Sequence, residues 1–308
     1  MRAGETAKVI LLFIDGLGIG DRDEKNPLAQ AENIEPLAHF KNTSPAKQEA
    51  AAAAAVIYDG LMIPTDARLG VEGRPQSASG QTTILTGVNA PLLLGYHKQG
   101  FPNQALRDVI AENSIFLRLK NLGVEPNVFA NTYTPQFFET TPRWKSATTV
   151  AVEAAGLSFR RLPDLLGRKA VFHDFTNETL RERGFDVPVF SPAEAAAIMG
   201  ELAKNHRFVL YEHFLTDKIG HERDFERARV LLPKLAEFVR EVVRRSDLEK
   251  TTVILTSDHG NIEDLSVRQH TLNDVPTIVW GRKNREIAGR IKSLADITPA
   301  ITSLLSEN

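Results

Sequence analysis

Short apolar segments alternate with longer amphipathic ones along the whole of this chain. Five segments are too short to be helices, and several of them are rich in Val and Ile: residues 8–14, 127–130, 208–211, 252–256 and 277–280. Segments of this kind are typical of strands that are buried on both faces and joined by crossover helices. We therefore predict an α/β fold, in which helices flank a mainly parallel central sheet.

The amphipathic segments predict where those helices lie. Residues 224–245 have apolar side chains three and four positions apart and a basic end, which indicates a surface helix that Pro233 can kink. Asp296 is predicted to cap a final helix. Residues 132–199 are less regular and rich in turn residues, so we expect a small cap or insertion there, over a core formed by residues 1–131 and 200–308.

Composition and charge exclude several classes of function. The 37 basic and 39 acidic side chains give a net charge of -2 over 308 residues, so we expect neither a nucleic acid nor a membrane as partner. The absence of Cys excludes disulfides, thiolate nucleophiles and zinc knuckles. The first apolar segment ends at Asp15 and is too short for a secretory signal or a membrane span, so we expect a cytoplasmic protein.

The first predicted strand ends in Asp15, and glycines follow at positions 16, 18 and 20. A dinucleotide-binding turn requires Gly-x-Gly-x-x-Gly, so the spacing is wrong, and the Gly-Lys-Ser/Thr ending of a phosphate-binding loop is absent. Asp15 would also repel a phosphate unless a cation lay between them. A strand-end Asp is often only a turn or cap residue, but the carboxyl edge of an α/β sheet is also where metal ligands gather.

Other acids and histidines occupy equivalent places. Asp258 and His259 follow the predicted strand at 252–256, and His270 precedes the one at 277–280. Asp217 and His221 are four residues apart, so both can face one point if their segment is helical. Each residue alone has an ordinary explanation, but six of them at the edge of one sheet indicate a metal centre.

A serine near such a centre suggests covalent phosphoryl transfer, which requires an oxygen nucleophile and is favoured at a helix N-terminus. The segment "GRPQSASGQTTILTG" places Ser77 where a helix is predicted to begin. Ser79, Thr82 and Thr83 are rival hydroxyls, and all four can also be ordinary capping residues.

Five motifs occur in order along the chain: "IDGLGIGD", "QSASGQ", "DKIGH", "SDHGN" and "HTLNDVP". With them the chain resembles the alkaline phosphatase superfamily of metalloenzymes, nearest the branch of cofactor-independent phosphoglycerate mutase and phosphopentomutase. The resemblance implies that Asp217, His221 and His270 hold one metal ion. It further implies that Asp15, Asp258 and His259 hold a second, with Ser77 bridging to it as the phosphoryl acceptor.

The donor set suits Mn²⁺ or Zn²⁺ better than Ca²⁺, and the resemblance puts Mn²⁺ first. The chain departs from the family pattern in two places. Gln81 stands where the mutases commonly have a histidine, and an amide cannot titrate. The segment between the two halves of the core is much shorter than the inserted domain of the mutases, which favours hydrolysis over isomerisation.

The expected function is therefore a two-metal phosphatase or phosphomutase that acts on a small phosphorylated metabolite through a phosphoserine at Ser77. Arg143 and Lys145 in the cap and Lys218 within "DKIGH" are candidates to bind the substrate's phosphate or carboxylate. Two alternatives stay open: a phosphodiesterase or phosphonate hydrolase on the same scaffold, and a catalytically silent metal-binding domain. The oligomeric state cannot be read from the sequence.

Overall fold

The computed structural model describes residues 6–41, 55–57, 59–140 and 144–307. Its main sheet has seven strands in the order β2-β3-β9-β8-β1-β7-β4. In chain order these are β1 (Lys8–Ile14), β2 (Ala55–Ile57), β3 (Gly60–Thr65), β4 (Asn127–Phe129), β7 (Phe208–His213), β8 (Thr251–Thr256) and β9 (Val275–Gly281). A second sheet pairs β5 (Thr132–Tyr133) with β6 (Arg160–Arg161).

Strands β4, β7, β1 and β8 are parallel to one another, whereas β9, β3 and β2 continue the sheet with antiparallel pairings. The predicted α/β class and mainly parallel sheet are confirmed, and each of the five predicted strands is present. The sequence did not indicate β2 and β3. Strand β3 is only half-buried and contains Pro64, so it lacks the continuous apolar pattern of a central strand.

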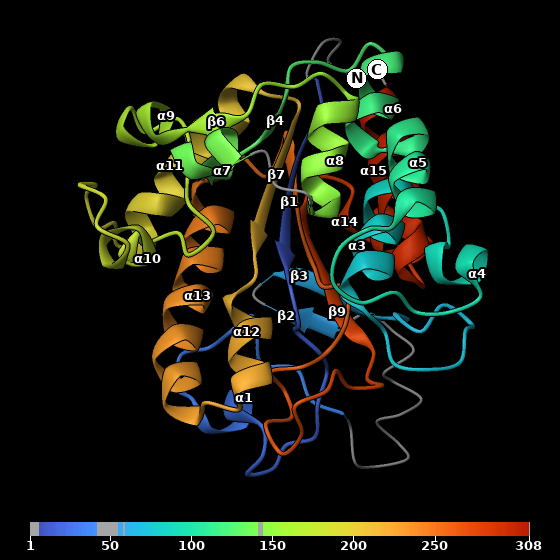
Figure 1. The fold of residues 1–308 in the computed structure, drawn as a ribbon, viewed down its shortest axis with the longest axis vertical. Coiled ribbons are helices and arrows are strands. Elements are labelled where there is room, and N and C mark those ends of the chain that lie inside the picture. The colour runs from blue at the N-terminus through green and yellow to red at the C-terminus, as the bar shows by residue number, and fades with distance from the viewer. Residues whose placement is uncertain (1–5, 42–54, 58, 141–143, 308) are drawn as a thin grey trace.

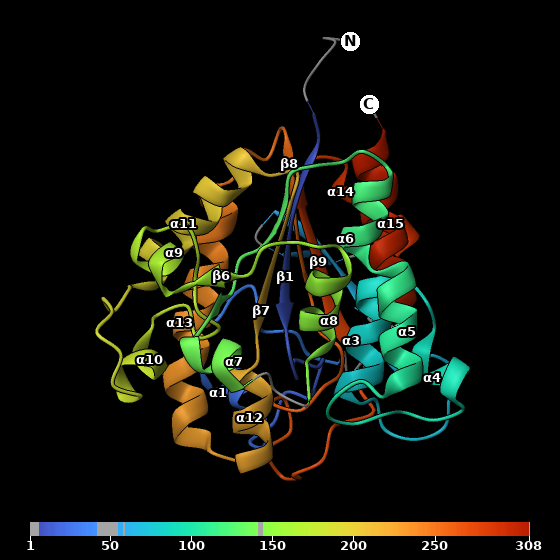
Figure 2. The ribbon, with the colours of Figure 1, turned by 45° about the horizontal axis from the view of Figure 1, so that its top comes forward.

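Helices cover both faces of the main sheet, as Figures 1 and 2 show. The first seven are α1 (Pro27–Gln30), α3 (Ser77–Thr86), α4 (Ala90–Leu94), α5 (Gln104–Asn113), α6 (Ile115–Asn121), α7 (Pro135–Thr140) and α8 (Ala147–Ala154). The others are α9 (Leu162–Leu166), α10 (Glu178–Glu182), α11 (Pro192–Asn205), α12 (Leu215–Glu222), α13 (Phe225–Arg245), α14 (Asn284–Arg290), the 3₁₀ turn η1 (Leu294–Asp296) and α15 (Ile297–Ser306). Within the described ranges, none of these helices combines the length and the hydropathy that a membrane span requires.

Strand β1 divides the core into two layers because successive side chains point to opposite faces. Ile10, Leu12 and Ile14 pack in the cluster that includes apolar residues of α11 and α13. The intervening side chains, Val9 and Leu11 among them, pack in the cluster that includes residues of α6, α8 and α15. A strand that is apolar on both sides therefore needs helices on both sides, which explains the three-layer arrangement.

Two helix predictions have different outcomes. Helix α13 spans the predicted segment and continues through Pro233, with Asp224 as its N-cap. Asp296 does stand at the N-cap of α15, but its carboxylate makes no capping bond to that helix. It accepts instead from the backbone N–H groups of Lys292 and Ser293, at 3.0 and 2.8 Å, and so closes the turn that precedes α15.

The segment 132–199 contains β5, β6 and short helices, together with α8 and the start of α11. Helix α8 contacts α3, α5 and α6, and α11 contacts α13, so both helices belong to the layers that cover the sheet. Their positions show how closely this segment is joined to the rest of the molecule. The division into a core and a cap stays a prediction.

Candidate metal centre

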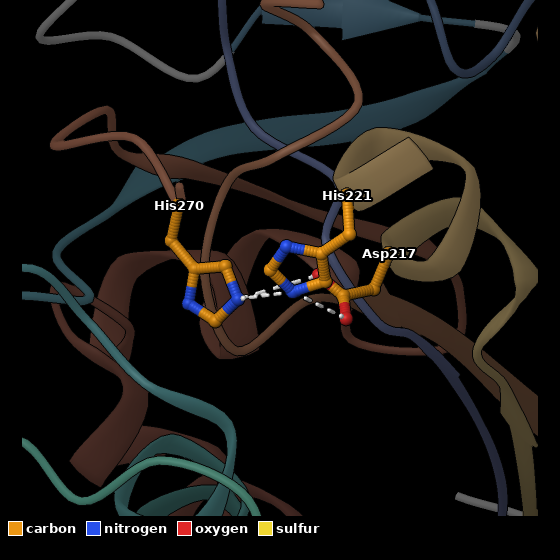
Figure 3. Close-up of side chains that lie close together, drawn as sticks. All are labelled: Asp217, His221 and His270. Atoms are coloured by element: carbon orange, nitrogen blue, oxygen red, sulfur yellow. Dashed lines mark hydrogen bonds and ion pairs between the residues drawn. The ribbon is translucent and has the colours of Figure 1, made fainter. Parts of the chain in front are cut away.

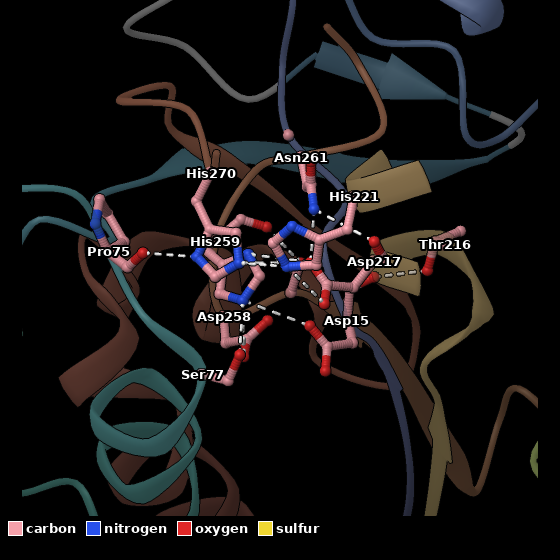
Figure 4. Close-up of polar contacts among 12 residues, drawn as sticks. Asp15, Pro75, Ser77, Thr216, Asp217, His221, Asp258, His259, Asn261 and His270 are labelled. Carbon is pink, nitrogen blue, oxygen red and sulfur yellow. Dashed lines mark hydrogen bonds and ion pairs between the residues drawn. The ribbon is translucent and has the colours of Figure 1, made fainter. Parts of the chain in front are cut away.

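The functional residues gather at the carboxyl ends of three neighbouring strands. Asp15 directly follows β1, α12 with Asp217 and His221 follows β7, and Asp258 and His259 follow β8. Because these strands are parallel, their ends meet at one edge of the sheet. Helix α3, which begins at Ser77, and the loop that carries His270 complete the cluster shown in Figure 4.

Asp217, His221 and His270 form the first group of potential ligands, in which one atom of each lies within 4.8 Å of the others. Asp217 Oδ2 is 3.3 Å from Nε2 of His221, and Oδ1 is 3.4 Å from Nε2 of His270. The four-residue spacing on α12 places the first two side chains together, as predicted (Figure 3).

Backbone carbonyls fix the orientation of both imidazoles. Nδ1 of His270 lies 2.8 Å from the carbonyl oxygen of Pro75, and Nδ1 of His221 lies 2.7 Å from that of Arg268. Since a carbonyl only accepts, each Nδ1 carries the proton, and a neutral ring then presents its lone pair on Nε2. The two Nε2 atoms are 3.1 Å apart, so either a proton on one ring or a metal cation between the rings offsets the repulsion of the two lone pairs.

The second group consists of Asp15, Asp217 and His259, again within 4.8 Å of one another. Nε2 of His259 lies 3.3 Å from Oδ1 of Asp15 and 3.5 Å from Oδ2 of Asp258. Asp258 is thus beside this group, where it was predicted, and Asp217 stands between the two groups. His259 also stacks on His270 with ring centroids 3.5 Å apart.

Ser77 is the hydroxyl that faces the cluster: its Oγ lies 3.0 Å from Nε2 of His259. The rival hydroxyls are buried and bonded to backbone atoms. Ser79 donates to Gln76, Thr82 donates to Ala78 and Thr83 donates to Ser79. Helix α3 begins at Ser77, as predicted, so the helix dipole favours negative charge beside this hydroxyl.

The cluster holds more negative charge than its surroundings offset. Burial and then repulsion from Asp258 and Asp217 raise the pKa of Asp15 well above its usual value. Burial and then Asp217 raise the pKa of Asp258 to about 7. Burial opposes ionisation of Asp217, but hydrogen bonds from His221 and His270 outweigh it and lower the pKa of that carboxyl.

Several buried polar atoms of the cluster have no hydrogen-bond partner in the described part of the chain. They are Oδ1 of Asp15, both carboxylate oxygens of Asp258 and Nδ1 of His259. Buried carboxylates are normally paired or bind metal. Oxygen and imidazole donors that converge without partners fit divalent cations such as Mn²⁺ or Zn²⁺.

Other contacts hold the candidate ligands in place, and of the residues that make them the sequence analysis had singled out only Gln81. Asn261 Nδ2 donates to Oδ1 of Asp217 at 2.6 Å, and Gln81 Nε2 donates to Oδ2 of Asp15 at 3.2 Å. Thr216 Oγ1 donates to the backbone oxygen of Asp15. Asn261 lies three residues after Asp258 in the motif "SDHGN", and this position in the motif was the signal that could have identified it. No sequence signal pointed to Thr216.

A pocket of about 420 Å³ opens beside Ser77 and is also lined by Asp15, Asp217 and Lys218. Of the three predicted substrate-binding residues, Lys218 therefore lies at the site. Lys145 forms a salt bridge with Glu153 at 2.8 Å and does not line the pocket. Arg143 lies outside the described residues.

Residues 184–308 match the family model described as the Metalloenzyme superfamily. Over 94 residues the chain is 29% identical to the 2,3-bisphosphoglycerate-independent phosphoglycerate mutase of Methanococcus vannielii, which covers 30% of this chain and 22% of the relative. It is 30% identical over 97 residues to the enzyme of the same name from Clostridium botulinum, covering 29% of this chain and 19% of that one. The matched segments thus span about a fifth of these curated relatives.

Solved structures match along almost the whole chain. The PH0037 protein from Pyrococcus horikoshii superposes with a TM-score of 0.56 and 14% identity, over 98% of both chains. A cold-active alkaline phosphatase from Shewanella sp. does so with a TM-score of 0.51 and 12% identity, over 97% of this chain and 99% of that one. Residues 184–308 are thus similar to the Metalloenzyme superfamily, a shorter segment is similar to cofactor-independent phosphoglycerate mutases, and the chain as a whole has an alkaline phosphatase-like fold.

Proposed function

We propose that this chain is a two-metal phosphoryl-transfer enzyme, which acts on a small phosphomonoester through a phosphoserine intermediate at Ser77. The observation that carries the proposal is the place of Ser77: its hydroxyl faces two groups of converging ligands and stands at the N-terminus of α3. Neither structural metal binding nor helix capping requires a hydroxyl at that point.

Asp217, His221 and His270 would hold one cation. Asp15, Asp258 and His259 would hold the other, with Asp217 within reach of both positions. When bound, two divalent cations supply a lowered pKa for the serine hydroxyl and positive charge beside the phosphate. We place Mn²⁺ first among the candidates, with Zn²⁺ as the alternative.

Residues of the chain itself carry out the other parts of the proposed reaction. Ser77 Oγ attacks phosphorus and its proton leaves to solvent or a neighbouring base, while the bond from phosphorus to the substrate's alkoxy oxygen breaks and that oxygen takes a proton from solvent to leave as the alcohol. The N-terminus of α3 favours the phosphate's negative charge. Lys218, which lines the same pocket, is the proposed partner of a non-reacting phosphate oxygen.

The phosphoserine can then transfer its phosphoryl group to water or to another hydroxyl of the substrate. Isomerisation requires the intermediate to be shielded from water while the substrate reorients. The segment 132–199 is short for that purpose, which favours hydrolysis.

A screen of phosphorylated metabolites with Mn²⁺, followed by ³¹P NMR, distinguishes released phosphate from an isomerised ester. We expect released phosphate, and an isomer as the main product would show that the protein is a mutase.

Trapping the intermediate tests the proposal directly. With ³²P-labelled phosphomonoester and Mn²⁺, acid quenching should leave label on the wild-type protein and none on Ser77→Ala. Ser79→Ala is the matched control, because that hydroxyl is bonded to backbone atoms, and it should retain the label. Full turnover by Ser77→Ala would refute the proposed nucleophile.

A further inference from the structure

The pocket beside Ser77 has several aromatic rings among its lining residues. Four rings line it: Phe101, Phe129, Tyr133 and Phe214. Phe129 and Tyr133 pack edge to face, with centroids 6.1 Å apart. Phe101 and Phe214 are 48% and 38% exposed although they are large apolar side chains. Exposed rings around a pocket mark a surface that is suited to contact a ligand.

A carboxylate lies among these rings. Glu212, on β7, lines the pocket and is only 8% exposed. Its Oε2 accepts from Thr148 Oγ1 at 2.8 Å. Asn131 fixes its backbone, since Asn131 Nδ2 donates to the carbonyl oxygen of Glu212 at 2.7 Å and Oδ1 accepts from its N–H at 3.0 Å. The side chain is therefore held in one position.

No cationic side chain forms an ion pair with Glu212 anywhere in the described ranges. Burial raises the pKa of Glu212 to about 7. A buried carboxylate that faces a cavity without a cation is costly, and a positively charged ligand would offset that cost. Aromatic faces add to the effect because their negative quadrupoles attract organic cations.

Lys218 does not supply that cation. It follows Asp217 on α12 and lines the same pocket, but it forms no ion pair with Glu212 in the part of the chain that is described. The pocket thus has one lysine, the proposed partner of the phosphate, and a carboxylate that lines the same pocket as the aromatic rings and can receive a cation on the rest of the substrate.

We infer that the substrate is the phosphate monoester of an amino alcohol, whose organic cation binds between Glu212 and the aromatic rings. The inference rests on the proposed function, because it describes the leaving group of that reaction. A phosphorylated carboxylic acid would bring a second negative charge against Glu212, so the pocket selects against it. Glu212 and Phe101 are then specificity-determining residues.

Three phosphate monoesters test the charge preference: phosphocholine, its neutral isostere 3,3-dimethylbutyl phosphate, and 3-phosphoglycerate. We expect kcat/KM with Mn²⁺ to be at least about tenfold higher for the cation than for the isostere, and lowest for the phosphoglycerate. A neutral ester that reacts as well as phosphocholine, or a preference for 3-phosphoglycerate, would overturn the inference.

Variants show whether Glu212 sets the preference. Glu212→Gln keeps the shape and an oxygen for Thr148 but removes the charge, so the ratio of kcat/KM for phosphocholine over the isostere should fall about tenfold. Glu237→Gln, on an exposed part of α13, is the matched control and should leave that ratio unchanged. An unchanged ratio in Glu212→Gln would also overturn the inference.

Phe101→Leu provides a second test in a side chain that is half-exposed, so that folding is not at risk. Leucine keeps the apolar contact but has no ring face, and the same ratio should fall about threefold.

Labelling of Ser77 by the neutral ester distinguishes failure of the substrate class from failure of the proposed function. If Ser77 is labelled but phosphocholine is not preferred over the neutral ester, the proposed substrate class is wrong and the phosphoserine intermediate stands. If no ester labels Ser77, both proposals are wrong.

Discussion

Asp217 has a central place among the ligands, because its two carboxylate oxygens contact different histidines. The backbone beside it is equally restricted. Gly16 has φ +74°, and a Cβ there would lie 2.7 Å from the Cα of Asp217. The glycine after the first strand is therefore needed both for its turn and for the close approach of α12. A dinucleotide-binding role is not the reason for it.

Gly16→Ala should destabilise the protein and displace Asp217. Gly95→Ala is the matched control: Gly95 has φ +79°, but nothing lies within 4 Å of the added Cβ, so it shows the cost of the backbone conformation alone. That cost is roughly 1–2 kcal/mol. Urea unfolding should show a larger loss for Gly16→Ala, accompanied by weaker Mn²⁺ binding. Equal losses would mean that the close approach to α12 does not matter.

The pH dependence of the metal-free protein should show the raised pKa of Asp258. Since this pKa is about 7 in the folded state and near 3.8 in the unfolded chain, the folded protein binds more protons between these values. Stability from this group is therefore lost as the pH rises from about 4 to 7. The unfolding free energy of Asp258→Asn minus that of the wild type should increase over that range in EDTA. A difference that is flat with pH would contradict the raised pKa.

The residues that make up the cluster were predictable from the sequence, but their grouping was not. Strand ends and the spacing of Asp217 and His221 follow from local patterns, and the order of motifs indicated the roles. The position of Asp217 between both groups depends on how α12 packs against the turn at Gly16, which is a tertiary contact. The same holds for Asn261 and Glu212, whose partners are 44 and 64 residues away in the chain.

At the scale of elements, α13 is a long helix that continues through a proline. Pro233 has no N–H to donate and lies in the interior of the helix. The apolar face of α13, which packs in the core with α11, maintains the helix across this gap. Packing outweighs propensity here, so the amphipathic pattern predicted the helix correctly in spite of Pro233.

Pro233→Ala should stabilise the protein, because it restores a backbone hydrogen bond and removes a steric clash. The gain should be roughly 1–3 kcal/mol, reduced by the greater freedom of the unfolded chain. Val230→Ala is the control in the same helix: Val230 is 61% exposed, and its loss should change the unfolding free energy by about 0.5 kcal/mol or less. Thermal and urea unfolding of both variants measure the difference, and a destabilised Pro233→Ala would show that the proline fits its neighbours.

The limits of prediction are also visible in the elements. The central strands are apolar on both faces and were recognised, whereas β2 and β3 pair antiparallel at the edge of the sheet and lack that pattern. Asp296 was recognised as a capping residue, but its carboxylate closes the turn before α15. The residue type indicates that a side chain can cap a helix, but the local backbone conformation determines which N–H groups its carboxylate binds.

At the scale of the whole molecule, bound cations should stabilise the fold, because the unfolded chain does not bring the ligands together. At one hundred times its Kd, a ligand of one site adds about 2.7 kcal/mol to the unfolding free energy. We expect Mn²⁺ to raise the urea midpoint of EDTA-treated protein by an amount that grows with its concentration. Asp217→Asn, which alters both groups, should show little of this response, and a full response would place the bound metal elsewhere.

The ligands come from both ends of the chain: Asp15 follows the first strand of the sheet, and His270 precedes the last. During synthesis on the ribosome, a partial chain that ends before His259 has some of the donors but neither complete set. Cation capture is therefore a late event, which reports that the sheet has closed. A cell short of the metal would accumulate a finished scaffold, ready to be loaded.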